Sequence, residues 1–587
     1  MKFYSKVLHT LLVLIPILIQ PDKIVLAQTS SYHDNSALKK NLEELADDYS
    51  KTTNLTSLAK TISGEEIFLV TLSTGQAESK PALLIVGGLN GTDLAGTEVI
   101  LNFMRTTVQN YGKVDSITQL VNSTTFYIFP RMNPEAVQTL FKNPAYGRDL
   151  NNRPMDLDQD GQIDEDGYDD LNQDGQITWM RIEEPGGEWM EDEDYLGLLK
   201  KADPTKGEKG VYRLIHEGLD NDGDGKINED EPGGVNFNQN FPFQYSFFDI
   251  GAGFHQISEP ETRAIADFIF SHPNIAAVFS FSPNDNLINP WEPSKSPENE
   301  NTEGRGRKPI TAVDKDDAAF YKNIAEVFKK ISGLNELPSF EKANGAFNPW
   351  VYYHLGRWSF SVPTWWPPDV AAKTDSLPAG SDSSKENSVK NSSEKNSKKQ
   401  ANGDKKTINQ RLWEWLQTTN QSDAYLSWKK INHPDYPDRN VEIGGFKPFA
   451  FSNPPSDSLS VIADKFRPFL YQIAAWLPRV ELNNQKVEHL NDNVYRLSLV
   501  ISNKGYLPTN PKIGIANQWC PKVKVALDLS EKQTLASGKI LQFADMISGS
   551  GGSKEFNWLI IGKRGETVNL TAGSPMTGIV KTTFKLD

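Results

Sequence analysis

A short apolar run, a glycine-rich turn and the start of a helix follow one another between Pro81 and Glu98. The run from Ala82 to Val86 contains no polar residue, which is typical of a strand buried on both faces of a sheet. Thr92 or Asp93 then offers the side chain that caps a helix reaching about Tyr111. A buried strand that leads directly into a helix favours an α/β fold, in which helices cover a largely parallel sheet.

Strand and helix patterns continue to alternate along the chain. We expect further strands at 66–72, 124–129, 276–282 and 358–362, and helices at 36–49, 258–272 and 316–331. These segments predict a mostly parallel, mixed sheet flanked by helices, in a domain covering residues 28–477. From Pro478 the pattern changes to short alternating strands separated by turns, which predicts a small Ig-like β-sandwich over 478–587.

Length and charge limit the possible classes of protein. A chain of 587 residues is too long for one compact core, so two or more domains are expected. The net charge of −15 disfavours nucleic acid and anionic membranes as partners. Much of this acidity lies between Asp156 and Glu231, so it belongs to one region. Cys520 is the only cysteine, which excludes an intramolecular disulfide and a cysteine-based metal site.

The N-terminus predicts export. Lys2 and Lys6 precede an apolar run from Leu11 to Ile19, and Val25-Leu-Ala27 supplies a small residue before a cut. We interpret residues 1–27 as a signal peptide, so that the mature chain has no transmembrane segment; a retained N-terminal anchor is the alternative. Export without disulfides fits a protein that a bacterium secretes, or holds in its periplasm or on its surface.

Residues 371–406 have a different composition from the rest of the chain. Ser, Lys, Asn, Asp and Glu dominate this segment, and apolar side chains are nearly missing. Such a segment cannot bury enough surface to offset its chain entropy, so we expect it to be disordered. Globular sequence resumes afterwards and continues through Trp476, which places this insertion inside the first domain.

The segment from Asp220 to Glu231 matches a twelve-residue calcium-binding loop. Oxygen-bearing side chains stand at its first, third and fifth places, glycine at the sixth and glutamate at the twelfth. Ca²⁺ is a hard cation that prefers carboxylate and carbonyl oxygens, and the glycine permits the tight turn. The expected calcium-binding residues of this loop are Asp220, Asp222, Asp224, Lys226 and Glu231.

Two weaker copies of this pattern precede it in the 156–231 region. The first offers Asp156, Asp158, Asp160, Gln162 and Asp164, with Gly167 at the twelfth place and Asp166 as a substitute for it. The second offers Asp170, Asn172, Asp174 and Gln176, with Arg181 at the twelfth place. No helix pair flanks these loops, so we expect calcium to stabilise the fold rather than to signal. The alternative is a solvated acidic loop without a bound ion.

Further segments occur in an order and spacing that carry a family resemblance. They are Phe129-Pro-Arg-Met-Asn-Pro-Glu135, Gly233-Gly-Val-Asn-Phe-Asn-Gln-Asn-Phe241, Ala277-Val-Phe-Ser-Phe-Ser-Pro283, Gly345-Ala-Phe-Asn-Pro-Trp-Val-Tyr-Tyr353 and Trp358-Ser-Phe-Ser-Val-Pro363. Together with the turn after Val86, they make the chain resemble the carboxypeptidase A-like zinc carboxypeptidases from about Ser36 to Trp476. This resemblance implies a peptidase fold and a zinc site at the carboxyl ends of the strands.

The resemblance also implies which residues stand at the metal positions. Asn90, Asp93 and Ser282 match the three zinc ligands, and Pro363 matches the general-base glutamate. Zinc-dependent hydrolysis needs three nitrogen or oxygen ligands and an open position for water. Asparagine, serine and a lone aspartate are a poor ligand set for zinc, and proline cannot accept a proton. The family implies zinc, whereas these substitutions predict its absence.

Three residues match the positions that contact substrate in the family. Asn238 is retained, Gln239 replaces the arginine that binds the terminal carboxylate of the substrate, and Arg181 matches the arginine that stabilises the oxyanion. The combined substitutions predict a catalytically inactive protein that binds a peptide or a cell-wall fragment.

Two alternatives remain open from the sequence. The first is an active metallocarboxypeptidase that releases C-terminal residues through a rearranged zinc site, for which Glu442, His433 and His354 are the candidates. The second is a structural envelope protein whose cleft holds no ligand. The identity of the ligand and the oligomeric state do not follow from the sequence.

Overall fold

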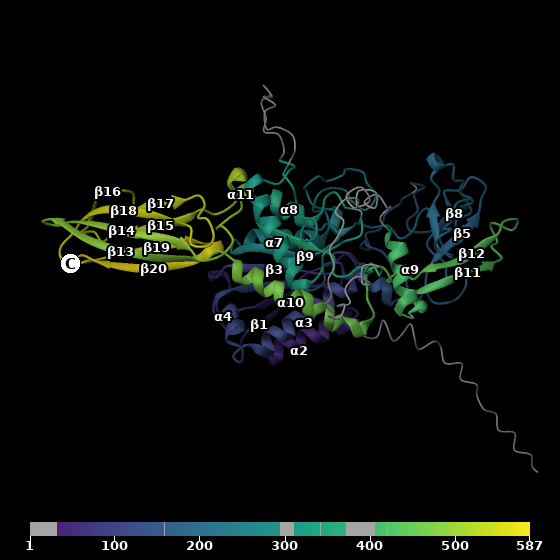
Figure 1. Ribbon diagram of the computed structural model, residues 1–587, viewed down its shortest axis with the longest axis horizontal. Helices are drawn as coiled ribbons and strands as arrows, with labels where there is room; N and C mark the ends of the chain where they lie inside the picture. Colours follow the sequence, from purple (N-terminus) through teal and green to yellow (C-terminus); the bar gives the residue numbers. More distant parts are fainter. Residues whose placement is uncertain (1–31, 158, 294–309, 341, 371–405, 420) are drawn as a thin grey trace, which may run out of the picture.

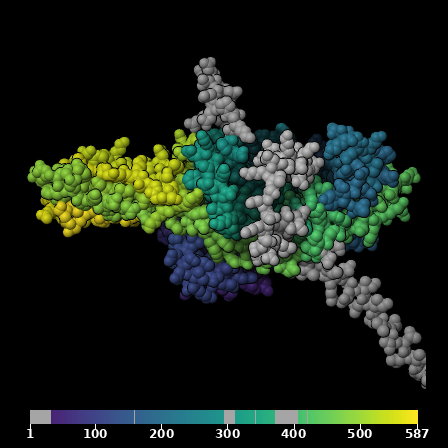
Figure 2. Space-filling view, in the orientation of Figure 1, coloured from purple at the N-terminus to yellow at the C-terminus, as the bar shows by residue number. Residues whose placement is uncertain are grey.

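The chain folds into three parts that lie in a row. In the computed structural model, an α/β part occupies the middle, a β-sandwich lies on the left, and a second sheet with long loops lies on the right (Figure 1). The space-filling view shows the sandwich projecting from the α/β part (Figure 2). The described residues are 32–157, 159–293, 310–340, 342–370, 406–419 and 421–587.

The middle part contains a six-stranded sheet in the order β1-β2-β4-β3-β9-β10. The strands β4, β3, β9 and β10 run parallel to one another, and β2 and β1 add an antiparallel edge beside β4. The sheet is therefore mixed with a parallel centre, which confirms the predicted fold class. The strand bounds are β1 (Thr53–Lys60), β2 (Glu66–Leu72), β3 (Ala82–Val86), β4 (Thr125–Phe129), β9 (Ile275–Phe281) and β10 (Trp358–Val362).

Helices cover both faces of this sheet, because β3 is apolar on both of its faces. Leu83 and Ile85 pack in one hydrophobic cluster with α2, α3, α7 and α10, whereas Leu84 and Val86 pack in another with α6 and α8. The helix bounds are α2 (Asn35–Asp48), α3 (Leu94–Asn110), α4 (Asp115–Ser123), α5 (Pro134–Gln138), α6 (Pro260–Ser271), α7 (Lys315–Ser332), α8 (Phe347–Tyr353), α9 (Ile408–Thr419), α10 (Leu459–Trp476) and α11 (Lys512–Asn517).

A second six-stranded sheet, which the sequence did not predict, has the order β11-β12-β5-β8-β6-β7 and antiparallel pairing. Its centre joins two segments far apart in the chain, because β5 pairs with both β8 and β12. This pairing brings the region after residue 406 back onto the acidic region. The bounds are β5 (Trp179–Glu183), β6 (Trp189–Glu191), β7 (Leu199–Lys201), β8 (Tyr212–His216), β11 (Tyr425–Ile431) and β12 (Val441–Phe446).

The C-terminal part is a sandwich of two four-stranded antiparallel sheets, β13-β14-β18-β16 and β17-β15-β19-β20. Alternate residues of the strands fill one core, with Trp558 and Tyr495 fully buried between the sheets. Asp317 of α7 accepts the backbone N–H groups of Lys512 and Ile513 in α11, which ties the sandwich to the α/β part. The bounds are β13 (Val480–Asn491), β14 (Val494–Asn503), β15 (Val523–Asp528), β16 (Thr534–Ser537), β17 (Leu541–Ala544), β18 (Ser553–Ile561), β19 (Thr567–Ser574) and β20 (Gly578–Lys585).

Two predictions fall largely on residues outside the described ranges, namely the signal peptide at 1–27 and the insertion at 371–406. The last residue of the insertion, Lys406, is described: its ammonium group pairs with Glu414 at 2.7 Å and with Asp369 at 3.5 Å. Among the described residues, no helix has both the length and the apolar character needed to cross a membrane.

Candidate functional site

The turn between β3 and α3 presents the first two positions that the resemblance assigns to zinc. Asp93 caps α3, because its Oδ1 accepts the N–H of Gly96 at 3.0 Å. Its Oδ2 accepts the hydroxyl of Thr364 at 2.8 Å, and burial raises the pKa of Asp93 to about 6. Both carboxylate oxygens therefore already have partners within the fold.

Asn90 and Thr92 of this turn bind one carboxylate, that of Asp149. Asn90 Nδ2 donates to Asp149 Oδ2 at 2.9 Å, and the Thr92 N–H and hydroxyl both donate to Asp149 Oδ1 at 3.1 Å. The Oδ1 of Asn90 is buried without a hydrogen-bond partner among the described residues. Sequence reasoning missed Asp149, because no spacing rule links it to a turn almost sixty residues earlier.

Ser282 stands at the carboxyl end of β9, as expected, and it is buried in a polar cluster. Its Oγ accepts Asn238 Nδ2 at 2.9 Å and the N–H of Asn284 at 3.2 Å. Asn238 Oδ1 in turn accepts the N–H of Phe347 at the start of α8. Gln239 points its Oε1 towards Gly251, where that oxygen is buried without a partner among the described residues.

The three strand ends meet at the start of α3. A Cβ placed on Gly96 would lie 3.0 Å from Thr364 Oγ1, 3.1 Å from Asp93 Oδ2 and 3.4 Å from Phe281 Cβ. Pro363 is buried between the end of β10 and Thr364. The structure thus brings the turn after β3 and the ends of β9 and β10 together, as the resemblance implied.

Arg181 does not belong to this group, and its assignment as an oxyanion or substrate-pocket residue is corrected. It lies in β5 of the second sheet, where its guanidinium pairs with Glu442 at 2.7 Å and with Glu191 at 3.2 Å. The rings of Tyr212 and Trp428 each lie 4.7 Å from it. The Arg181 guanidinium therefore already interacts with two carboxylates and two aromatic rings.

The candidates for a rearranged zinc site do not gather. Glu442 pairs with Arg181, His433 Nε2 contacts the carbonyl of Gly218 at 2.9 Å, and His354 at the end of α8 contacts the ring of Phe243. Within the described part of the chain, no group of three metal-ligating side chains includes any of the three candidates. Glu442 lies within β12, His433 follows β11, and His354 lies at the end of α8.

The three acidic loops share one backbone arrangement. In each of them the carboxylate of the first residue accepts the N–H of the glycine at the sixth place, at 2.8 to 3.0 Å. The residues at the fourth and sixth places all have positive φ angles, so the chain turns in the same way three times. These residues are Gln159 and Gly161, Gln173 and Gly175, and Gly223 and Gly225.

The first and third loops brace each other through two buried carboxylates. Asp230 accepts the N–H groups of Leu157 and Asp164 at 2.6 and 2.7 Å. Asp166 accepts those of Asn221 and Asn228 at 3.0 and 2.5 Å. Asp166 therefore does not serve its own loop as a twelfth-place substitute, and this prediction is corrected.

Three other predicted calcium-binding residues also have partners in the fold. Glu231, at the twelfth place of the third loop, accepts the hydroxyl of Tyr168, and Asp164 accepts the N–H of Gly233 at 2.9 Å. The ammonium group of Lys226 lies 2.7 Å from Asp224. The carboxylates that do come together among the described residues are Asp220, Asp222 and Asp224 in one group, and Asp160, Glu165 and Asp222 in another.

Asp158 lies outside the described residues, whereas the second loop is fully described. Asp170 Oδ1 and Asn172 Oδ1 both accept the N–H of Asp174, and Asp174 Oδ1 accepts that of Gln176 at 3.0 Å. The oxygen-bearing side chains of this loop therefore converge, as the spacing predicts. The residue at its twelfth place, Arg181, instead contacts Glu442, Glu191 and two aromatic rings.

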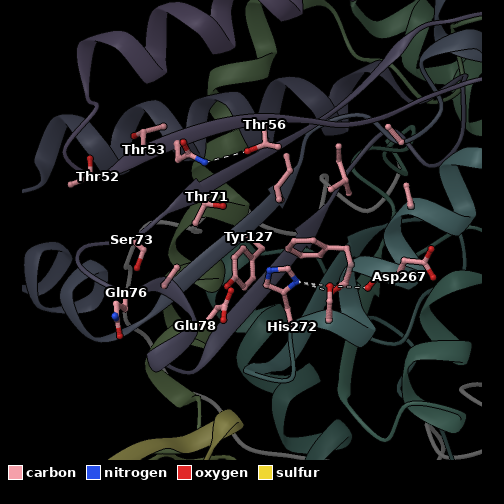
Figure 3. Close-up of a pocket in the computed structure, with 18 of the residues that line it drawn as sticks. Thr52, Thr53, Thr56, Thr71, Ser73, Gln76, Glu78, Tyr127, Asp267 and His272 are labelled. Carbon is pink, nitrogen blue, oxygen red and sulfur yellow. Dashed lines mark hydrogen bonds between the residues drawn. The ribbon is translucent and has the colours of Figure 1, made fainter.

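A large cavity lies away from the zinc positions. It has a volume of about 1260 Å³ and lies between α6, the edge strands β1 and β2, and residues 75–79. Figure 3 shows Thr56, Thr71 and Tyr127 on neighbouring strands of the sheet, with His272 beside Tyr127. Sequence reasoning did not predict this cavity, because β1 and β2 form it together with the distant helix α6.

Two further cavities adjoin the site at Ser282. A polar one of about 190 Å³ is lined by Asn284, Lys342 and Asn344 among others. An apolar one of about 1200 Å³ runs on to Trp519. The two cavities adjoin each other, and we refer to them together as the groove; the residues that line both are Phe243, Gln244, Thr311 and Tyr353.

Comparison with known proteins supports the interpretation of the fold. A family model described as zinc carboxypeptidase matches residues 38–160 and 212–369, and a domain of unknown function matches 479–585. Mouse carboxypeptidase M is 28% identical over 126 residues, which are 21% of this chain and 28% of that protein. Carboxypeptidase E of Caenorhabditis elegans is 29% identical over 143 residues, which are 23% of this chain and 30% of that protein. The chain thus spans less than a third of the length of these relatives.

Solved structures of the same class are also similar in part. The crystal structure of thrombin-activatable fibrinolysis inhibitor has a TM-score of 0.36 and 16% identity, and covers 59% of this chain and 74% of its own. Carboxypeptidase A of Helicoverpa armigera has a TM-score of 0.34 and 16% identity, and covers 57% and 64%. The mixed sheet, its helices and the matched segments together place the α/β part of this chain in the zinc carboxypeptidase family.

Proposed function

We propose that this chain is a non-catalytic member of the family, which binds a peptide or a cell-wall fragment without cleaving it. The observation that carries the proposal is the set of contacts around Asn90, Asp93 and Ser282. Each of these side chains is held by neighbours of the same fold: Asp149, Thr364 and Asn238, respectively.

The residues at the zinc positions do not fit zinc. The metal is bound by thiolate, imidazole and carboxylate groups, and Asp93 is the one such group among the three. Ser282 already accepts two hydrogen bonds, and Asn90 donates its amide to Asp149. Without zinc, water near neutral pH is not activated as hydroxide, and the buried Pro363 cannot act as a base in its place.

The groove, which reaches Asn284 at its polar end, favours a binding role. Its polar end carries the ammonium group of Lys342, which suits a terminal carboxylate. The amides of Asn284 and Asn344 in the same wall also donate to Ala343 and Ser246, and the carboxylate of Asp285 there accepts backbone N–H groups. The outer part of the groove is lined by Phe243, which stacks on Tyr353 at 4.0 Å, and by other aromatic residues. A groove with a polar end and apolar walls suits an extended chain with an apolar side chain near its carboxyl terminus.

Binding measurements with two matched pairs of variants test this role. We expect Lys342→Ala and Phe247→Ser to weaken the binding of peptides with free C-termini by roughly tenfold each, because each removes about 1–2 kcal/mol of contact. The controls Lys322→Ala in α7 and Phe543→Ser in β17 change equally exposed residues away from the groove. Equal binding by all four variants would place the ligand elsewhere. The absence of binding to any peptide or peptidoglycan fragment would favour the structural alternative.

We further propose that the acidic loops bind calcium. The repeated turn geometry, the converging carboxylates and their mutual repulsion without a cation all support this assignment. Loops of this exposed kind suit the 10⁻⁴–10⁻³ M dissociation constants of extracellular calcium modules. Such affinities require the calcium levels outside the cytoplasm, in keeping with a secreted, periplasmic or surface protein.

A further inference from the structure

We propose that Glu217 completes a calcium site in the second acidic loop, in place of a ligand at the loop's twelfth position. This inference rests on the proposed calcium binding and adds a residue that lies outside all three sequence patterns. The site would take Ca²⁺ through Asp170, Asn172 and Asp174, the carbonyl of Gln176 and the carboxylate of Glu217.

The backbone of Glu217 crosses the base of this loop. Its N–H donates to the carbonyl of Thr178 at 3.1 Å, and its carbonyl accepts the N–H of Asp169 at 3.2 Å. These two contacts join residue 217 to both ends of the loop. The neighbouring residue, His216, stacks on Trp179 at 4.2 Å, which fixes the segment further. Residue 217 thus lies where a twelfth-place ligand closes such a loop.

The side chain of Glu217 is fully buried, and one of its two carboxylate oxygens has hydrogen-bond partners among the described residues. Its Oε1 accepts the N–H and the hydroxyl of Thr178 at 2.7 and 3.2 Å. Its Oε2 has no hydrogen-bond partner among the described residues, and the carboxylates of Asp174 and Asp170 act on it electrostatically. A buried carboxylate oxygen without a partner is costly, and a bound Ca²⁺ would remove this cost.

The other two loops also hold a buried carboxylate at the ninth residue, but both oxygens of that carboxylate accept N–H groups, whereas Glu217 keeps one oxygen without a partner among the described residues. Asp230 accepts the N–H of the ninth residue of the first loop, and Asp166 accepts that of the third. Glu217 accepts the N–H of Thr178, the ninth residue of the second loop. All three carboxylates are buried and come from outside the loop they serve. In the second loop Glu217 takes the place of the twelfth residue, so that Arg181 makes its ion pairs with Glu442 and Glu191 instead.

The number of calcium ions bound per chain tests the proposal. Titration of the chelator-treated full chain with Ca²⁺ should show that Glu217→Gln loses one site, or binds at it at least tenfold more weakly. Glu217→Asp, which keeps the charge but shortens the reach, should weaken the same site. Asp170→Asn with Asp174→Asn should remove that site, and adding Glu217→Gln should remove no further one. Glu193→Gln, an exposed change, is the matched control.

The outcomes separate this inference from the calcium proposal itself. If the unchanged chain binds no calcium, the calcium proposal fails and the inference fails with it. If the chain binds calcium and Glu217→Gln binds the same number with the same affinities, the inference alone is overturned. In chelator, Glu217→Gln should melt no earlier than the unchanged chain, because it removes a buried charge. A lower melting temperature there, with calcium binding unchanged, would show that Glu217 only supports the loop.

Discussion

Asp166 and Asp230 occupy the same place in two acidic loops, and each accepts two backbone N–H groups from the loop of the other. Both side chains are almost fully buried. The two loops therefore hold each other in shape through a reciprocal exchange of carboxylates. Because of this exchange, Asp222 of the third loop lies close to Asp160 and Glu165 of the first, although the two loops are about sixty residues apart in the chain.

We predict that Asp166→Asn and Asp230→Asn destabilise the chain by similar amounts. Each change replaces one accepting carboxylate oxygen by an amide NH₂ group, which then faces a backbone N–H group and cannot bond to it. A hydrogen bond to a charged group contributes about 1.5–3 kcal/mol. The double variant should lose less than the sum, because both residues support one pair of loops. Urea denaturation measures this, with the exposed Asp267→Asn in α6 as the control. Strict additivity would contradict the reciprocal exchange.

Removal of calcium should lower the melting temperature. A ligand that binds only the folded chain stabilises it by about 2.7 kcal/mol at a hundredfold excess over its dissociation constant. Chelator should abolish this gain, and Ca²⁺ should restore it better than Mg²⁺, which tolerates irregular loops poorly. Asp220→Ala with Asp224→Ala should remove most of the response, whereas the exposed Asp545→Ala should leave it intact. A melting temperature that chelator does not change would count against calcium binding.

Arg181 should matter for stability and not for ligand binding. Arg181→Met leaves Glu442 without its cation in a largely buried position, which costs about 3 kcal/mol. The matched control, Arg439→Met, breaks the exposed pair with Glu184 and should cost less than about 1 kcal/mol. Denaturation and peptide binding should be measured on both variants. Weaker ligand binding by Arg181→Met at unchanged stability would restore Arg181 to the substrate site.

Glu261 should make the chain less stable as the pH rises. Its Oε1 accepts Asn151 Nδ2 at 2.6 Å, its Oε2 has no partner among the described residues, and burial raises its pKa to about 7. Because the pKa in the folded state lies above that in the unfolded state, the stabilising contribution is complete below about pH 4 and is lost as the pH rises to about 7.

Replacement of Glu261 by glutamine should remove this dependence. The difference in unfolding free energy between Glu261→Gln and the unchanged chain should shift by about 3 kcal/mol, in favour of the variant, between pH 4 and pH 8. Urea denaturation at the two pH values measures the shift. The exposed Glu326→Gln in α7 should show none. An equal difference at both pH values would mean that Glu261 ionises normally in the fold.

The parallel centre of the α/β sheet could be predicted because its evidence is local. The run from Ala82 to Val86 is apolar at every residue, and the cap at Asp93 follows within a single turn. The second sheet could not be predicted in the same way. Its central strand β5 pairs with β12 across more than 250 residues, and no local pattern reports such a pairing.

The same difference between local and long-range evidence applies to the residues of the candidate site. The positions of Asn90, Asp93 and Ser282 followed from motifs, because Ser282 directly follows β9 and the other two lie in the turn between β3 and α3. The roles of Asp149 and Glu217 did not, because each is defined by a contact with a distant backbone. The assignment of Arg181 failed since its spacing fitted a motif while its strand belongs to another sheet.

Release of C-terminal residues from a panel of peptides, with added zinc and with chelator, tests most directly whether the chain is a non-catalytic member of its family. We predict no release above background under either condition, because no residue at the positions of Asn90, Asp93, Ser282 and Pro363 supplies a zinc site and a base. Enzymes lower their barriers by about 8–23 kcal/mol, which the remaining polar groups cannot provide alone. Chelator-sensitive release that zinc restores, and that Glu442→Gln or His433→Ala abolishes, would establish a working metal site and contradict this conclusion.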